Sequence, residues 1–236
     1  MKSAGGGMRV AGKLFVIEGT DGSGKSTQFQ LLRKALTEWG VRHRAITFPR
    51  YNEESSAPVR LYLSGRLGLH PDDVGPYAAS SFFAIDRYIS YRTDWMRDYL
   101  AGVPILCDRY TTSNAVHQAA KLSGQERDRY LDWLFDYEYR LLGLPEPTRV
   151  FFLDMPSELA LELLRRRQGE AGDIHETDHE YLSRCRESAL YVCRRCGWTA
   201  IPCAAQGRPL APEQISTQIV EQVSRFLNEQ PEQNFN

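Results

Sequence analysis

The sequence predicts an α/β domain of three layers, with a five-stranded parallel sheet between two layers of helices. Five short apolar runs recur along the chain, and segments with a helical spacing of apolar residues lie between them. Continuous apolar runs of this length are typical of strands that are buried on both faces. Their alternation with helices implies crossover connections that cover both faces of the sheet. The runs are 14–17, 45–48, 103–107, 150–153 and 199–203.

Helical patterns fill the segments between these runs. After the first run, apolar residues recur at helical spacing until Gly40, which supplies a natural C-terminal stop. Ser157 can cap a helix after the fourth run, and an amphipathic pattern follows Pro212. Residues 76–100 and 126–142 also look helical and are too long for simple connections. We therefore expect them to form walls around a site.

Length and composition favour one domain without a polyanionic partner. The 236 residues suit a single domain at 13–229, with a flexible extension at 1–12 and a polar tail at 230–236. A net charge of −1 gives no overall field that would favour nucleic acid or an anionic membrane. No apolar run of about 18 residues and no secretion signal is evident, so we expect no membrane contact. The five cysteines are then expected to be reduced thiols in a cytoplasmic protein.

The most specific motif follows the first apolar run. Residues 19–26, GTDGSGKS, match G-x-x-x-x-G-K-[ST], with a predicted strand before the motif and a predicted helix after it. The backbone N–H groups of such a P-loop cradle phosphate oxygens, and the positive end of the helix faces the same oxygens. Lys25 can reach the outer phosphates and the Ser26 hydroxyl can ligate Mg²⁺. The sequence therefore predicts a nucleoside triphosphate site at Gly19, Thr20, Asp21, Gly22, Ser23, Gly24, Lys25, Ser26 and Thr27.

Three further segments carry residues suited to a second ligand. Arg50 follows the second strand and can fork onto a phosphate, or it is a surface arginine after a turn. Phe83 and Arg87 share a helix face, so the ring can stack on a base whose edge the arginine contacts, unless the ring belongs to the core. Asp108 at the end of the third strand can hold Mg²⁺ or pair with an arginine, and Arg109 would face the attacked phosphate.

Polar residues continue beyond the third strand. The amide of Asn114, between Ser113 and Gln118, offers the donor and acceptor that a pyrimidine edge requires. Farther on, three arginines at 165–167 precede a glycine-containing segment. This arrangement fits a mobile lid at about 165–178, with a solvated run at a helix end as the alternative.

Four segments together resemble the thymidylate kinases. They are FVIEGTDGSGKST at 15–27, FPRY at 48–51, FFAIDR at 82–87 and DRYTTSNAVHQ at 108–118, and the resemblance extends from about Lys13 to Cys203. It implies a P-loop NTPase-like fold, a homodimer, and Mg²⁺-dependent transfer of the ATP γ-phosphoryl group to dTMP, which gives dTDP and ADP.

The resemblance also implies residue roles. Arg50 would hold the acceptor phosphate, and Asp21 would accept a hydrogen bond from the 3′-hydroxyl. The family often has a tyrosine where this chain has His117, near the 2′ side of the sugar, so the departure bears on deoxyribose selection. Members that have no arginine at the position of Gly22 supply one from the lid. The resemblance thus assigns substrate contacts to Asp21, Arg50, Phe83, Arg87, Arg109, Ser113, Asn114, His117 and Gln118, catalysis to Lys25, Arg109, Arg165 and Arg167, and Mg²⁺ to Ser26 and Asp108.

Several alternatives remain at this stage. One is a kinase for another pyrimidine nucleotide or a nucleoside, and another is an ATP-binding switch that transfers no phosphoryl group. HETDH at 175–179 matches the zinc-protease pattern H-E-x-x-H, but an N-cap at Thr177 or Asp178 would leave His175 outside the helix. We expect Cys193 and Cys196 to be buried free thiols, because a lone pair of cysteines is weak evidence for a metal.

Overall fold

The computed structural model describes residues 11–168 and 179–228, and it confirms the predicted five-stranded parallel sheet. The strand order is β2-β3-β1-β4-β5. Because all five strands are parallel, their carboxyl ends meet at one edge of the sheet. The strands are β1 (Leu14–Gly19), β2 (Arg44–Thr47), β3 (Ile105–Asp108), β4 (Arg149–Asp154) and β5 (Thr199–Pro202).

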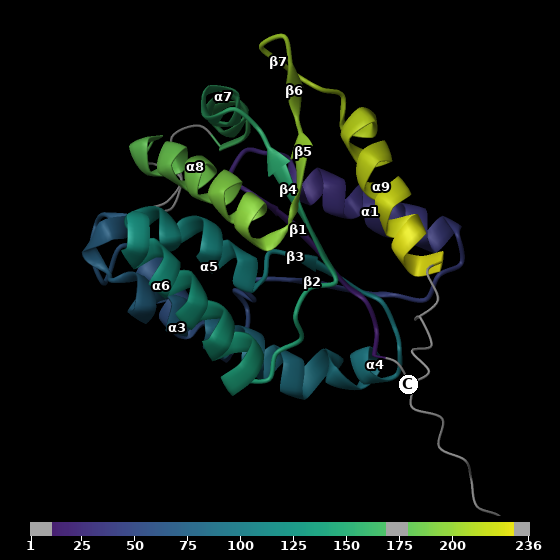
Figure 1. Cartoon of the computed structure of the whole chain (residues 1–236), viewed down its shortest axis with the longest axis horizontal. Coiled ribbons are helices and arrows are strands. Elements are labelled where there is room, and N and C mark those ends of the chain that lie inside the picture. Colours follow the sequence, from purple (N-terminus) through teal and green to yellow (C-terminus); the bar gives the residue numbers. More distant parts are fainter. Residues whose placement is uncertain (1–10, 169–178, 229–236) are drawn as a thin grey trace, which may run out of the picture.

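Helices cover both faces of this sheet (Figure 1). α1 (Lys25–Glu38) and α9 (Pro212–Asn228) pack on one face. On the other face lie α5 (Thr111–His117) and α8 (His179–Cys196), with α3 (Pro76–Ser90) and α6 (Gly124–Phe135) packed against α5. The side chains of β1 alternate between the two cores, Phe15 and Ile17 on the α1 side and Leu14 and Val16 on the other. This two-sided burial explains why the first run is apolar throughout.

The two long predicted helical stretches are confirmed with an interruption in each. Residues 76–100 form α3, a π-helical turn η3 (Tyr91–Trp95) and α4 (Met96–Leu100), while α6 continues into the π-helical η5 (Asp136–Leu141). α8 begins at His179, directly after the N-cap expected at Thr177 or Asp178, and it ends at Cys196. The remaining elements are η1 (Glu54–Ser56), α2 (Ala57–Leu63), η2 (Pro71–Asp73), η4 (Ala119–Lys121), α7 (Ser157–Gln168) and the hairpin of β6 (Ala204–Ala205) and β7 (Arg208–Pro209).

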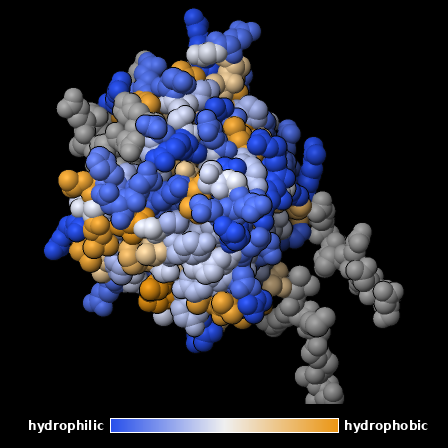
Figure 2. Space-filling view, turned by 60° about the vertical axis from the view of Figure 1, so that its left-hand side comes forward, coloured by the Kyte–Doolittle hydropathy of each residue, from blue (hydrophilic) through white to orange (hydrophobic). Residues whose placement is uncertain are grey.

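Some expectations fall partly on undescribed residues. Residues 165–168 of the predicted lid continue α7, and 169–178 lie outside the described residues, as do most of the HETDH segment and of the two predicted tails. The cysteines at 107, 185, 193, 196 and 203 are unpaired, as expected, but Cys196 is exposed, so the prediction of burial is wrong for it. None of the described helices is long and apolar enough to cross a bilayer. On the side that carries α3, α6 and α8, hydrophobic residues lie in patches between hydrophilic ones (Figure 2).

Candidate active site

The glycine-rich loop connects β1 to α1 at the carboxyl edge of the sheet. Gly22 and Gly24 have φ angles of 81° and 89°, a left-handed conformation that glycine adopts without steric cost. Lys25 folds back over the loop, where its Nζ donates to the carbonyls of Gly19 at 2.9 Å and Thr20 at 2.8 Å. Burial lowers the pKa of Lys25, and the nearby Arg109 lowers it further. The loop is therefore held in a closed turn by the residue expected to contact the outer phosphates.

A cavity of about 650 Å³ opens in front of this loop. Ser26 and Asp108 both line it, which brings together the two predicted Mg²⁺ ligands. Asp108 is 8% exposed, and its buried Oδ1 has no hydrogen-bond partner among the described residues. Burial also raises the pKa of Asp108. A buried, unsatisfied carboxylate oxygen and an exposed serine that line the same cavity suit a hard cation such as Mg²⁺.

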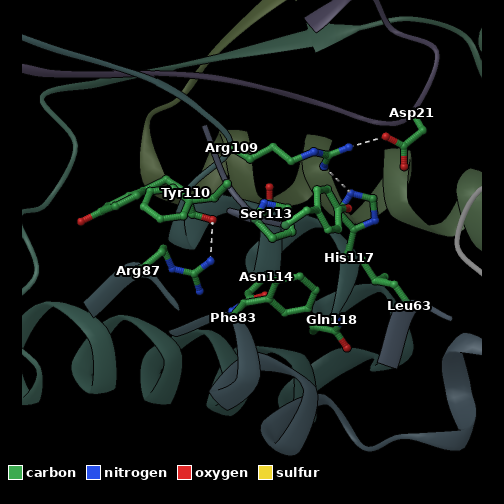
Figure 3. A pocket seen from close by; sticks show the side chains of 13 residues that line it. Asp21, Leu63, Phe83, Arg87, Arg109, Tyr110, Ser113, Asn114, His117 and Gln118 are labelled. Carbon is green, nitrogen blue, oxygen red and sulfur yellow. Dashed lines mark hydrogen bonds and ion pairs between the residues drawn. The ribbon is translucent and has the colours of Figure 1, made fainter. Parts of the chain in front are cut away.

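Arg109 follows β3 with a φ of 65°, which is unusual for a residue other than glycine. Strain of this kind costs about 1–3 kcal/mol and is concentrated at functional sites. The conformation directs the guanidinium toward Asp21 of the loop and to within 3.2 Å of the Nε2 atom of His117 (Figure 3). It also lies 3.8 Å from Glu18. Because these carboxylates surround it, the pKa of Arg109 is raised and the side chain stays cationic.

A second cavity, of about 100 Å³, adjoins the first and is also lined by Arg109 (Figure 3). The two cavities share the walls formed by Asp21, Phe48, Pro49, Tyr51 and Arg109. Gln118 is fully buried, and both polar atoms of its amide have no hydrogen-bond partner among the described residues. An unpaired amide in a cavity wall suits a polar ligand. The predicted substrate residues that line this cavity are Asp21, Phe83, Arg87, Arg109, Ser113, Asn114, His117 and Gln118.

Glu138 of η5, which the sequence reasoning missed, holds two residues that line the second cavity. Its carboxylate accepts two hydrogen bonds from Arg87, at 2.6 and 2.7 Å, in a pair that is almost fully buried. It also accepts from Thr111 at 2.8 Å and from Asn114 at 3.4 Å. Glu138 therefore orients two predicted base contacts at once. The only sequence signal is an acid within an aromatic helical stretch, and such an acid is ordinarily exposed.

Glu18, at the end of β1, is a second missed residue. It is fully buried, and its Oε2 accepts from the hydroxyls of Thr112 at 2.9 Å and Ser113 at 2.8 Å. Its Oε1 accepts the N–H of Gly19, the first residue of the loop, at 3.0 Å. Glu18 therefore ties the glycine-rich loop to α5. An acid within an apolar run, directly before the motif, is the signal that could have identified it.

Four predicted residues whose positions are described line neither cavity: Gly19, Thr20, Arg50 and Arg165. Arg50 is directed to Asp86, whose carboxylate accepts from its backbone N–H at 2.8 Å and from its Nε at 3.3 Å. Arg165 is exposed on α7 and lines neither cavity, although Leu163 and Leu164 of the same helix line the larger one. Arg167 belongs to α7, but its side chain lies outside the described part of the chain.

Comparisons with known proteins point to one family. A family model described as "Thymidylate kinase" matches residues 17–228. The thymidylate kinase of Mycobacterium tuberculosis is 33% identical over 177 residues, which cover 72% of this chain and 81% of that protein. A probable thymidylate kinase of Pyrobaculum aerophilum is 28% identical over 216 residues, 89% of this chain and 96% of that protein.

A solved structure shares the fold. It is the thymidylate kinase of Candida albicans, which superposes with a TM-score of 0.65 at 22% identity over 92% of this chain and 93% of that chain. The family match spans most of the residues that build the loop, both cavities and the helices around them. The chain therefore belongs to the thymidylate kinase family.

Proposed function

We propose that the protein transfers the γ-phosphoryl group of ATP to dTMP, which gives dTDP and ADP. The observation that carries this proposal is the pair of adjoining cavities that meet at Arg109. A triphosphate in the glycine-rich loop and a monophosphate in the second cavity would meet there. A phosphate oxygen of dTMP bonds to the γ-phosphorus as the bond from that phosphorus to the β,γ-bridging oxygen breaks. The attacking oxygen is already anionic, so no general base is required.

The side chains would act by position and charge. Lys25 and Arg109 stabilise negative charge on the transferring group, and catalysis of this kind rests mainly on alignment and electrostatics. Ser26 and Asp108 would hold Mg²⁺, because an unsatisfied carboxylate oxygen and a hydroxyl line one cavity. When bound, Mg²⁺ neutralises charge on the phosphates. We propose that Arg165 and Arg167 approach the donor only when a lid at 165–178 closes.

The base would lie in the smaller cavity. Phe83 packs edge-on against Tyr62, with ring centroids 6.2 Å apart, and lines the cavity, where it can stack on thymine. Arg87 uses three N–H groups for Glu138 and for the carbonyl of Tyr110, which leaves others to donate to a base oxygen. The amides of Asn114 and Gln118 complete a polar edge. To bind the acceptor phosphate, the side chain of Arg50 would have to release Asp86.

A coupled assay of ADP formation with dTMP, dUMP, UMP and dGMP tests this function. We expect dTMP to be preferred and Arg109→Ala to lose about 10³ in kcat. The matched control is Arg195→Ala, which removes an arginine that pairs with Asp128 and Asp132 outside both cavities. A preference for UMP or a purine would mean another nucleotide kinase. Absence of ADP with every acceptor would mean a nucleotide-binding switch.

We also propose a homodimer formed through α3. Ile85, Tyr88 and Ile89 share one face of this helix and are 43%, 37% and 37% exposed. Three large apolar side chains exposed on one helix mark a contact surface. Light scattering should give twice the chain mass for the wild type and the monomer mass for Ile85→Glu. A monomeric wild type would disprove the proposal.

We infer a cytoplasmic location from the thiols. Cys107, Cys185, Cys193, Cys196 and Cys203 are all unpaired. Unpaired cysteines in this number are typical of a reducing compartment. Fractionation of cells should recover the protein with cytoplasmic markers.

A further inference from the structure

His117 joins Arg109 to α8. It is the last residue of α5 and is 5% exposed. Its Nε2 lies 3.2 Å from Nη1 of Arg109, and its Nδ1 lies 3.5 Å from Sγ of Cys185 on α8. Its backbone carbonyl accepts a hydrogen bond from the hydroxyl of Tyr181, also on α8, at 2.6 Å. His117 is therefore held at both ring nitrogens and at its backbone carbonyl.

These contacts determine the position of the ring proton. A guanidinium can only donate, so Nε2 of His117 must be the acceptor from Arg109. A neutral imidazole then carries its single proton on Nδ1, which donates to Sγ of Cys185. The histidine is thus held as the Nδ1–H tautomer.

We propose that neutral His117 is a positioning residue, which fixes the phosphate-binding guanidinium of Arg109 against α8. This inference rests on the proposed function, because Arg109 is taken to contact the transferred phosphate. The role differs from a contact with the sugar, since His117 acts here through Arg109. Asp21 holds the other end of the same guanidinium, so the histidine and the loop aspartate together set its orientation.

The groups around the ring favour its neutral form. Arg109 faces Nε2, with Asp21 and Glu18 behind it, and Cys185 and Tyr181 of α8 face the other side. Lys121 of η4 and Arg184 of α8 add positive charge near Cys185. Burial raises the pKa of Cys185 and of Tyr181, so both groups are neutral at pH 7. A second proton on His117 would remove the acceptor and set two cations face to face.

The kinetic test compares His117→Gln with His117→Phe. Glutamine places a non-titrating carbonyl oxygen near the position of Nε2, whereas phenylalanine keeps a ring without an acceptor. We expect His117→Phe to lower kcat about tenfold or more at pH 8, and glutamine to recover much of this loss. Equal losses in both variants would overturn the proposal.

A spectroscopic test is independent of activity. The signals of His117 in ¹⁵N spectra of the histidine side chains are assigned by their absence in His117→Gln. At pH 8 these signals should show the ring proton on Nδ1. A proton on Nε2 would disprove the contact with Arg109, even if dTMP proved not to be the substrate. Failure of the phenylalanine variant to fold would leave this test intact. Cys185→Ala should shift the Nδ1 resonance, and Cys193→Ala, two turns along the same helix, should not.

Discussion

Removal of the charge of Glu138 should destabilise the protein strongly, because its carboxylate is the only described ion-pair partner of the buried Arg87. In Glu138→Gln, one oxygen becomes an NH₂ group. One orientation of the amide sets that group against Nη2 of Arg87 and the other against Nε, so a donor faces a donor in either case. Loss of one partner of a buried pair costs about 3–5 kcal/mol. For a chain of this length, that corresponds to a fall in Tm of about 6–20 °C.

Urea unfolding of a double-mutant cycle measures the effect. Glu138→Gln and Arg87→Met should each be destabilised, and the double variant should lose less than the sum of the two, by about 2–3 kcal/mol. Asp136→Asn is the matched control, because Asp136 lies on the same turn but pairs with Arg140 at the surface, so its unfolding midpoint should not move measurably. A cost below about 1 kcal/mol for Glu138→Gln, or strict additivity, would refute the account of a charged and buried hub.

Three other predictions follow from single positions. Gly22→Ala should abolish nucleotide binding, because a Cβ there would lie 2.2 Å from the carbonyl oxygen of Ala160. In the control Gly24→Ala, the added Cβ meets nothing within 4 Å, so this variant should lose only about 1–2 kcal/mol of stability to backbone strain, as measured by urea unfolding. Burial lowers the pKa of Lys121 to about 8, so between about pH 8 and 10.5 the unfolded chain binds more protons than the folded one. The free energy of unfolding should therefore rise with pH in this range, and this rise should be absent in Lys121→Met. Asp108→Asn should bind ATP more weakly than the wild type with Mg²⁺ but more tightly in EDTA, as measured by calorimetry.

Sequence reasoning succeeded where the physics is local. The glycine-rich motif, the apolar runs and the helical spacing depend on residues that are neighbours along the chain, and these parts of the fold are confirmed. Phe83 and Arg87 share a cavity for the same reason, since their spacing alone places them on one helix face.

Long-range pairing is what the sequence could not supply. Glu138 meets Arg87 across 51 positions, and His117 meets Cys185 across 68, so nothing in either neighbourhood specifies the partner. Glu138 also lies in a π-helical turn, which shifts side chains off the regular helical spacing. For Arg50, the sequence identified the strand end correctly but gave no sign of competition from Asp86.

The balance of charge around the loop explains why the effect of Asp108→Asn should change sign. Lys25 and Arg109 supply two positive charges there, and the buried or half-buried Glu18, Asp21 and Asp108 supply three negative ones. A triphosphate without a cation therefore meets a loop around which these five side chains carry one excess negative charge, in surroundings where screening by water is weak. Neutralising Asp108 relieves that repulsion in EDTA. With Mg²⁺ the same substitution removes a ligand oxygen, and the lost coordination outweighs the relieved repulsion. Unchanged binding in EDTA would mean that Asp108 acts only through the metal, and weaker binding in EDTA would refute the account of repulsion.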